Sequence, residues 1–159
     1  MAIIGIVAVD RNGAIGKNGS IPWHYSSDVK FFKQQTIGHA CAMGYTTWLS
    51  LKKPLKERLN IVLSRKSEIK PQPSMIVLRD TLSVLSLKKF LACDLFIIGG
   101  EQVYRSFLPH IDRWIVTEIP MAVEGADTFM PEGYLQGFEP YASQELEENL
   151  RVTFYERQG

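Results

Sequence analysis

The chain lacks several features that would assign it to a functional class at once. Its 159 residues include 2 cysteines and 3 histidines, scattered without the spacing of metal ligands. The formal net charge is only +1, without the basic surplus typical of nucleic-acid binders. No apolar run is long enough to span a membrane. We therefore expect no metal site, no nucleic-acid partner and no membrane partner.

Targeting signals and the common nucleotide-binding fingerprints are also missing. The N-terminus, Met1 to Ile4, has no basic leader and runs straight into a strand pattern, which predicts a cytoplasmic protein without a signal peptide. Cys41 and Cys93 stand beside apolar residues, which favours reduced thiols. Neither G-x-G-x-x-G nor G-x-x-x-x-G-K-[ST] occurs. Any phosphate site must therefore be built differently.

Strand and helix patterns alternate along most of the chain. Continuous apolar runs, typical of strands covered on both faces, are followed by segments with helical spacing. Residues 150–155 instead alternate apolar and polar side chains, as in an antiparallel strand with one wetter face. This order predicts an α/β fold with a mostly parallel sheet and an antiparallel edge. The expected strands are 3–9, 40–43, 61–63, 75–78, 95–98, 114–119 and 150–155, and the expected helices are 26–37, 45–51, 81–91 and 101–108.

Three stretches show no clear periodicity. Residues 10–20 contain three glycines and are predicted to form a long flexible loop. Residues 67–74 contain two prolines and indicate a surface loop. Residues 120–140 are predicted to be irregular as well. Long loops inside compact domains are often binding loops or lids, so we expect one beside the functional site.

The acid Asp28 has two interpretations. It stands in the first turn of the expected 26–37 helix, where Ser26 or Ser27 would provide the cap. A carboxylate there gains about 0.3–1 kcal/mol from the helix dipole. Alternatively, Asp28 faces an apolar pocket and binds a polar ring. Local rules favour the first interpretation, because buried acids are rare. The apolar stripe of this helix is expected to comprise Val29, Phe32 and Thr36.

Polar groups gather at three expected strand ends, which is where ligands bind in open α/β sheets. Gly44, followed by Thr46 and Thr47, and the pair Gly99-Gly100 each join a strand to a helix, an arrangement that suits a phosphate. Ser64-Arg65-Lys66 ends a third strand, and a guanidinium can bind phosphate through two donors. Each feature also has an ordinary interpretation, as a simple turn or a solvated basic loop.

Two single residues leave similar alternatives open. Arg58 either pairs with a carboxylate or lies exposed on the surface. Thr117 lies within an apolar strand, where threonine is most often only a good strand former.

Short motifs spread along the chain carry a family resemblance. They are Ile6-Val7-Ala8, Ile15-Gly16, Ile21-Pro22-Trp23, Asp28, Phe32-Lys33, Met43-Gly44, Thr47-Trp48, Pro54-Leu55, Arg58, Asn60, Ile98-Gly99-Gly100, Val103-Tyr104, Thr117 and Glu124 to Phe129. In this order and spacing the chain resembles the dihydrofolate reductases, over nearly its whole length.

The resemblance implies a single domain over residues 1–159, with an eight-stranded, mostly parallel sheet, an antiparallel C-terminal strand and four flanking helices. It implies hydride transfer from NADPH to the pterin ring of 7,8-dihydrofolate, which gives 5,6,7,8-tetrahydrofolate for one-carbon metabolism. Ring protonation is expected to occur through water. Antifolates such as trimethoprim or methotrexate are expected inhibitors, and the protein is expected to be a monomer.

The resemblance also implies residue roles. Asp28, Trp23 and Thr117 are expected at the catalytic centre, and Asp28 would bind the ring nitrogen and amino group of the pterin. Arg58, helped by Lys33, would bind the carboxylate of the glutamate tail. The expected substrate contacts are Ile6, Ile21, Asp28, Val29, Phe32, Lys33, Ser50, Leu51, Leu55, Arg58, Ile98, Tyr104 and Thr117. The expected cofactor contacts are Ala8, Ala14, Ile15, Gly16, Asn18, Gly19, Ser20, Gly44, Tyr45, Thr46, Thr47, Leu63, Ser64, Arg65, Lys66, Gly99, Gly100, Glu101, Gln102, Val103 and Tyr104.

One departure from the family concerns the cofactor. Tyr45 stands where many bacterial members have an arginine that binds the extra phosphate of NADPH, and Gln102 occupies another position that is often basic. Arg65, in a Leu-Ser-Arg run like that of the vertebrate enzymes, and Lys66 are expected to compensate. NADPH is therefore predicted to be preferred over NADH.

Two other functions stay open. One is a reductase of the same fold acting on another pterin-like or pyrimidine substrate, as in riboflavin synthesis. The other is a non-catalytic nucleotide-binding module. Asp28 together with Arg58 favours folate over the first, and the second would not need Trp23, Asp28 and Arg58 together.

Overall fold

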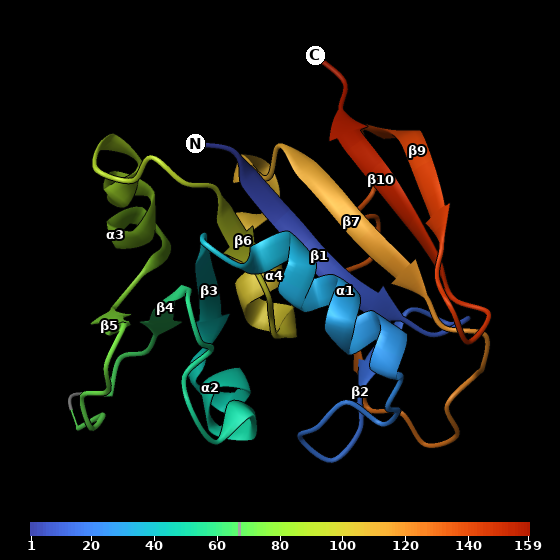
Figure 1. Cartoon of the computed structure of the whole chain (residues 1–159), viewed down its shortest axis with the longest axis horizontal. Helices are drawn as coiled ribbons and strands as arrows, with labels where there is room; N and C mark the ends of the chain where they lie inside the picture. The colour runs from blue at the N-terminus through green and yellow to red at the C-terminus, as the bar shows by residue number, and fades with distance from the viewer. Residues whose placement is uncertain (67) are drawn as a thin grey trace.

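The chain forms a layered α/β structure, described for residues 1–66 and 68–159 by a computed structural model (Figure 1). The main sheet contains β1 (Ile3–Val9), β3 (Ala40–Gly44), β4 (Leu59–Leu63), β5 (Met75–Leu78), β6 (Leu95–Ile97), β7 (Arg113–Glu118), β9 (Phe138–Glu145) and β10 (Arg151–Arg157). The α-helices are α1 (Ser26–Thr36), α2 (Tyr45–Leu51), α3 (Thr81–Ser86) and α4 (Glu101–Phe107). A smaller sheet pairs β2 (Ala14–Gly16) with β8 (Thr128–Phe129). Residue 67, the first of the loop predicted over 67–74, lies outside the described residues.

The strands of the main sheet follow the order β5-β4-β3-β6-β1-β7-β10-β9. Neighbouring strands pair in parallel, except that β10 is antiparallel to both β7 and β9. The predicted α/β fold is therefore confirmed: an eight-stranded, mostly parallel sheet with an antiparallel C-terminal strand and four helices. Among the described residues, no helix combines the length and the apolar character needed to cross a membrane.

Helices cover both faces of the sheet. Phe31 of α1 packs into one buried cluster with Met43 and Val62, and the side chains of α2 lie against the same cluster. Val84 of α3 and Phe107 of α4 belong to the cluster on the opposite face. Figure 1 shows this arrangement, with α1 in front of β1 and β7 and α4 behind the sheet. Because the central strands are buried on both sides, their sequences are continuously apolar.

Gly5 makes room for a large side chain of the core. It pairs with Trp114 across β1 and β7, and the Trp114 side chain is fully buried. A Cβ atom on Gly5 would lie only 2.4 Å from the Trp114 ring. The close approach therefore requires glycine here, and it fixes the register of β1 against β7. That register sets the positions of Ile6 and Thr117 in these strands.

Parts of the two long segments predicted to be irregular are ordered as strands. β2 lies within residues 10–20 and pairs antiparallel with β8, which lies within 120–140. β9 also begins inside the second segment. The prediction was wrong at these residues because β2 has 3 residues and β8 has 2, too few to show a periodic pattern. Pairing between segments this far apart is a tertiary effect.

Asp10 holds the start of the first segment in place. Its carboxylate is buried and accepts three backbone N–H bonds of 2.8 Å, from Asn12, Ala14 and Val123. Burial acts to raise the pKa of Asp10, but these N–H groups together lower it below its usual range. A charged Asp10 therefore ties residues 10–20 to residues 120–140.

The start of α1 is capped from a distant turn. Its N-cap residue is Tyr25, which forms no side-chain cap bond. Instead, the Ser27 N–H donates to the Glu148 carboxylate at 2.8 Å, and Ser27 Oγ donates to the Glu147 carbonyl at 2.9 Å. The prediction that Ser26 or Ser27 provides the cap was wrong, because the acceptor comes from the turn between β9 and β10.

Two helices differ from the predictions in detail. On α1, Phe31 and Thr36 are the buried residues, whereas Val29 is 54% exposed, so the predicted stripe of Val29, Phe32 and Thr36 was partly wrong. The helix predicted over 81–91 divides into α3 and a 3-10 turn at Leu87–Lys89. Cys41 and Cys93 are both free thiols, as predicted.

Candidate active site

Strands β3 and β6 are neighbours, yet the chain leaves them in opposite directions. From β3 it passes through α2 to β4, which lies toward the β5 edge of the sheet. From β6 it passes through α4 to β7, which lies toward the β9 edge (Figure 1). Such a switch point creates a crevice at the carboxyl ends of the strands, where open α/β sheets bind ligands. The topology therefore places a candidate site at Gly44 and at Gly99-Gly100.

The two glycine junctions lie against each other in this crevice. The Gly44 N–H donates to the Gly99 carbonyl at 2.8 Å. A Cβ on Gly100 would lie 3.8 Å from Thr47 Oγ1, so the first turns of α2 and α4 meet here. Gly99 has φ +113, in the region that favours glycine. The structure thus brings together two glycine junctions that are 55 residues apart in the sequence, each of which alone is only weak evidence of a phosphate site.

Asp28 faces Thr117 across the space between α1 and β7. Burial raises the pKa of Asp28, and the Thr117 hydroxyl lowers it by a smaller amount, so the pKa lies above its usual range. Thr117 itself is buried, at 2% exposure. The predicted pair is therefore brought together, and Asp28 has the partly desolvated carboxylate expected of a ring-binding residue.

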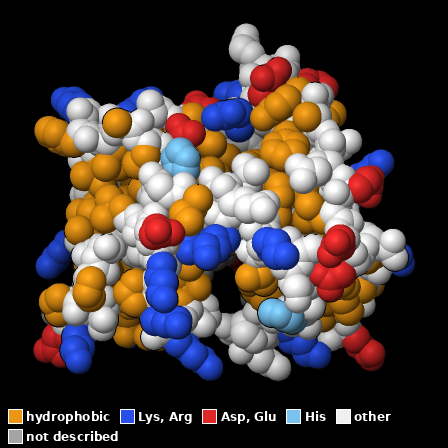
Figure 2. Space-filling model, viewed as in Figure 1, with side chains coloured by type: hydrophobic (Ala, Val, Ile, Leu, Met, Phe, Trp, Pro, Cys, Tyr) orange, Lys and Arg blue, Asp and Glu red, His pale blue; other side chains and the backbone are white. Residues whose placement is uncertain are grey.

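Apolar side chains pack on the face of the sheet that is covered by α1, the helix that carries Asp28. Phe32, Leu51, Leu55 and Ile98 all pack on the cluster that contains Phe31. Figure 2 shows a hollow on this face, between α2 and the beginning of α1, with lysine and arginine side chains along one side. This face thus combines an apolar cluster, a helix that carries one partly buried acid and a hollow with basic side chains along one side.

Arg58 is buried rather than exposed, and it has no carboxylate partner among the described residues. Its exposure is 8%. Its Nε donates to the Lys56 carbonyl at 2.8 Å, and Nη1 donates to Thr36 Oγ1 at 3.1 Å. The alternative of an exposed surface arginine was therefore wrong, whereas pairing with a carboxylate stays a prediction. The guanidinium is fixed by internal acceptors, and its remaining N–H groups can bind the carboxylate of a ligand. Sequence reasoning missed Thr36 as its support, because a buried helix threonine suggested only packing.

The loop beside the site is tied to residues 124–129. The Asn18 N–H donates to the Asp127 carboxylate at 2.9 Å, and Lys17 Nζ donates to the Glu124 carbonyl at 2.8 Å. The Asn18 N–H is also the largest cause of a lowered pKa at Asp127. Lys17 and Asn18 of the loop over residues 10–20 are thus held by hydrogen bonds to Glu124 and Asp127.

Tyr104 links the glycine junction to β1. Its buried hydroxyl donates to the Ile6 carbonyl at 2.8 Å, and burial raises the pKa of this phenol. A Cβ on Gly99 would lie 3.2 Å from the Tyr104 ring. Tyr104 therefore holds in place the backbone of Ile6, one of the predicted substrate contacts.

The basic segment after β4 lies beside the start of α2. Gly44 pairs with Leu63 at the ends of β3 and β4, so Tyr45 and Ser64 begin at the same edge. Lys66 Nζ lies 4.5 Å from the centroid of the Tyr45 ring. The structure thus brings Tyr45 and Lys66 into contact, a pairing that the sequence order did not reveal.

The predicted contacts differ in exposure. Of the predicted substrate and catalytic residues, Ile21, Val29, Lys33 and Ser50 are exposed, Trp23, Asp28, Phe32, Leu51, Leu55 and Ile98 are half-buried, and Ile6, Arg58, Tyr104 and Thr117 are buried. Of the predicted cofactor residues, Asn18, Gly19, Ser20, Thr46, Arg65, Lys66 and Gln102 are exposed, Ala8, Ile15, Gly44, Tyr45, Thr47, Leu63, Ser64, Gly100, Glu101 and Val103 are half-buried, and Ala14, Gly16, Gly99 and Tyr104 are buried.

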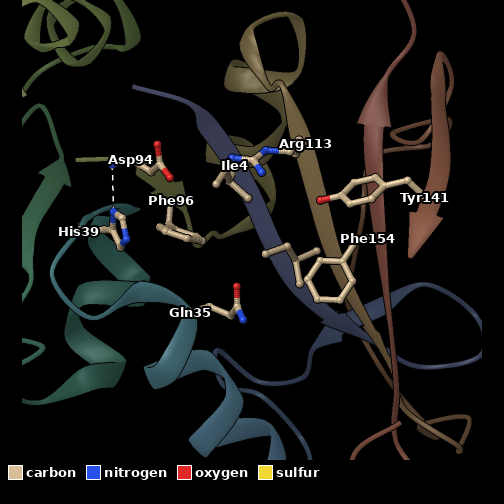
Figure 3. Close-up of a pocket in the computed structure, with 9 residues that line it drawn as sticks. Ile4, Gln35, His39, Asp94, Phe96, Arg113, Tyr141 and Phe154 are labelled. Carbon is tan, nitrogen blue, oxygen red and sulfur yellow. Dashed lines mark hydrogen bonds between the residues drawn. The ribbon is translucent and has the colours of Figure 1, made fainter. Parts of the chain in front are cut away.

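A second depression lies elsewhere and contains none of these residues. It has a volume of about 190 Å³ and is shown in Figure 3. Its lining residues are Ile4, Gln35, His39, Asp94, Phe96, Arg113, Ile115, Tyr141 and Phe154. Ile4 and Arg113 stand near the amino ends of β1 and β7, at the opposite end of the strands from the glycine junctions. This depression is therefore separate from the candidate active site.

Comparison with known proteins points to one family. The family model described as dihydrofolate reductase matches residues 2–158. The dihydrofolate reductase of Bacillus subtilis is 37% identical over 129 residues, which cover 80% of this chain and 74% of that protein. The Mycobacterium leprae dihydrofolate reductase is 38% identical over 125 residues, covering 75% and 73%. A solved structure of Enterococcus faecalis dihydrofolate reductase complexed with NADP(H) and RAB-propyl superposes with a TM-score of 0.91 at 29% identity, covering 99% of this chain and 97% of that one.

Proposed function

This chain belongs to the dihydrofolate reductase family, and we propose that Asp28, Thr117 and Arg58 hold 7,8-dihydrofolate while it is reduced to 5,6,7,8-tetrahydrofolate with hydride from NADPH. The observation that carries the assignment of residues is the partly buried Asp28 beside Thr117, on the helix that covers the apolar face of the sheet. A second observation is the buried, internally supported Arg58.

Asp28 binds the pterin ring through its ring nitrogen and amino group. Each hydrogen bond to a charged group is worth about 1.5–3 kcal/mol. Two such bonds exceed the gain of about 0.3–1 kcal/mol that a first-turn acid receives from the helix dipole. Hydride transfer needs neither a nucleophile nor a metal, but it needs two rings held close together in a dry site. One carboxylate in an apolar slot meets that need.

Arg58 and Lys33 bind the glutamate tail of the substrate. The Arg58 guanidinium is already oriented by Lys56 and Thr36, so little side-chain freedom is lost when it binds a carboxylate. Lys33 is exposed on α1 and can approach from the solvent side. A buried arginine with donors to spare supports recognition of folate over a substrate without an acidic tail.

The residues present fit NADPH, which supplies the hydride when bound. The pyrophosphate would contact the joined glycine junctions and Thr47, where backbone and hydroxyl donors converge. The nicotinamide end would extend toward β1 and Asp28, and the adenosine end toward Ser64, Arg65 and Lys66 after β4. The other predicted cofactor contacts, in the loop from Ala14 to Ser20 and along α4, remain part of this proposal.

The proton added to the pterin ring comes through water. Asp28 is the acid that we place in the substrate slot, and its carboxylate is engaged with the ring. We assign the loop bearing Ile21, whose side chain is 65% exposed, to the mouth of the site, where it would admit or exclude water. Trp23 forms the adjoining wall.

We also propose a cytoplasmic location and a monomeric state. The free thiols of Cys41 and Cys93 support a reducing compartment. Antifolates would bind in the same place, because their rings resemble the pterin ring of the substrate.

A simple assay tests the function. Purified protein is mixed with NADPH, and the NADPH absorbance is followed before and after dihydrofolate is added. Loss that depends on dihydrofolate is the expected result. Loss only with a pyrimidine substrate would favour the alternative reductase, and NADPH binding without turnover of either substrate would favour a nucleotide-binding module.

A further inference from the structure

The contact between Tyr45 and Lys66 joins two elements at the edge of the cofactor crevice. Tyr45 is the first residue of α2, and Lys66 lies three residues beyond the end of β4. The Lys66 ammonium stands over the Tyr45 ring at 4.5 Å from its centroid, a distance typical of a cation–π interaction. The Lys66 N–H also donates to Ser64 Oγ at 3.1 Å, which shapes the turn after the strand. Both the side chain and the backbone of Lys66 are therefore held.

The sheet topology indicates which end of the cofactor reaches this pair. The pyrophosphate is placed at the switch point between β3 and β6, and the pterin is placed near β1 and β7 by Asp28 and Thr117. The nicotinamide must meet the pterin, so the adenosine must extend the other way, toward β4. That direction leads to the carboxyl end of β4, where Ser64, Arg65 and Lys66 follow the strand. This step rests on the proposed function.

Arg65 and Lys66 differ in their electrostatic surroundings. Hydrogen bonds from Ser83 are the largest cause of the lowered pKa of Asp80, and the charge of Arg65 contributes to it as well. The charge of Arg65 thus acts on an exposed carboxylate of the same chain. Lys66 instead faces the uncharged Tyr45 ring, which leaves its positive charge available to a phosphate.

We propose that Tyr45 is a positioning residue that holds the Lys66 ammonium for the adenosine 2′-phosphate of NADPH. The Tyr45–Lys66 pair, rather than Arg65, then sets the preference for NADPH over NADH. A lysine ammonium has three N–H donors, so the ring can cover one side while the others bind phosphate oxygens. A free lysine side chain would lose more rotational freedom on binding, and the ring restricts that freedom beforehand.

Four variants test the proposal: Tyr45→Phe, Tyr45→Leu, Lys66→Met and Arg65→Met. The main readout is kcat/KM for NADPH divided by kcat/KM for NADH, with dihydrofolate as substrate. Tyr45→Phe keeps the ring and should keep the ratio. Tyr45→Leu and Lys66→Met should each lower the ratio on the order of tenfold, whereas Arg65→Met should lower it less.

The double variant Tyr45→Leu/Lys66→Met separates positioning from independent binding. Residues that act as one unit are not additive, so the double variant should lower the ratio no further than Lys66→Met alone. Fully additive losses, an unchanged ratio in Lys66→Met, or a larger loss in Arg65→Met would overturn the proposal. Unfolding midpoints of all variants show whether any change comes from the fold.

A binding measurement keeps this test independent of the reaction. The affinities of 2′,5′-ADP and 5′-AMP differ only through the 2′-phosphate. Tyr45→Leu and Lys66→Met should weaken 2′,5′-ADP on the order of tenfold and 5′-AMP much less. If dihydrofolate were not reduced, this comparison would still report on the pair. Equal weakening of both nucleotides would refute the role in phosphate recognition.

Discussion

Replacing Asp28 with asparagine separates the two interpretations of this residue. Asparagine has nearly the same shape but no charge, and it retains one acceptor oxygen. If Asp28 binds the pterin, the variant loses at least one charge-assisted hydrogen bond, worth about 1.5–3 kcal/mol, and at most two. Since about 1.4 kcal/mol corresponds to a factor of ten, kcat/KM for dihydrofolate should fall by roughly 10- to 10⁴-fold.

The stability of the same variant should move in the other direction. Burial raises the pKa of Asp28, which means that the folded state disfavours its charged form. Removing the charge relieves this cost, so the unfolding midpoint at neutral pH should stay the same or rise. A residue that acted only at the helix end would instead lose dipole stabilisation of about 0.3–1 kcal/mol on neutralisation.

Asp80 provides a matched control, because it is an acid that does cap a helix. Its side chain accepts a hydrogen bond of 2.8 Å from the Ser83 N–H at the start of α3. Asp80→Asn should lower the unfolding midpoint and leave kcat/KM for dihydrofolate at the wild-type value. The assays are steady-state NADPH consumption and urea unfolding of both variants. Near-normal turnover in Asp28→Asn, together with reduced stability, would refute the binding role and restore the capping interpretation.

Three further predictions follow from the same geometry. Arg58→Lys loses the forked guanidinium, so KM for dihydrofolate should rise roughly 10- to 100-fold with a smaller change in kcat. KM for a substrate analogue without the glutamate tail should stay the same, and equal effects on both substrates would contradict tail binding. Because the folded-state pKa of Asp28 is raised, its contribution to stability is fully present below the unfolded-state pKa of about 3.9 and is lost as the pH rises through the higher folded-state pKa. The stability of Asp28→Asn relative to wild type, measured by urea unfolding, should therefore increase over that pH range, and a pH-independent difference would contradict the raised pKa. Asp10→Asn weakens three backbone hydrogen bonds of 2.8 Å and should reduce the unfolding free energy, measured by denaturant titration, by about 1–3 kcal/mol. A much smaller loss would show that the β2–β8 pairing alone holds residues 10–20 against residues 120–140.

The fold class could be predicted from the sequence because its causes are local. A strand buried on both faces has a continuously apolar sequence, and β1, β3 and β6 all show this pattern. Glycines at Gly44 and Gly99-Gly100 identified the strand-to-helix junctions. The shortest elements were missed, since β2 and β8 exist only because they pair with each other.

The identity of the candidate site residues was also accessible from the sequence, through the ordered motifs shared with one family. Those motifs identified Asp28, Arg58 and Thr117, but their environments came from the structure. Asp28 has a raised pKa because α1 places it against β7. Arg58 is buried and held by Thr36, although composition favours an exposed arginine.

The sequence alone therefore determined the alternation of elements, the glycine junctions and the acid at the head of α1. Tertiary structure decided how these parts meet. The switch point exists only once β6 inserts between β3 and β1. The cap of α1 comes from Glu148, 121 residues from Ser27, and the contact between Lys66 and the Tyr45 ring joins the segment after β4 to the start of α2. The physical reason is the same in each case: local patterns follow from nearest neighbours along the chain, whereas charge, burial and contact depend on residues that folding brings together.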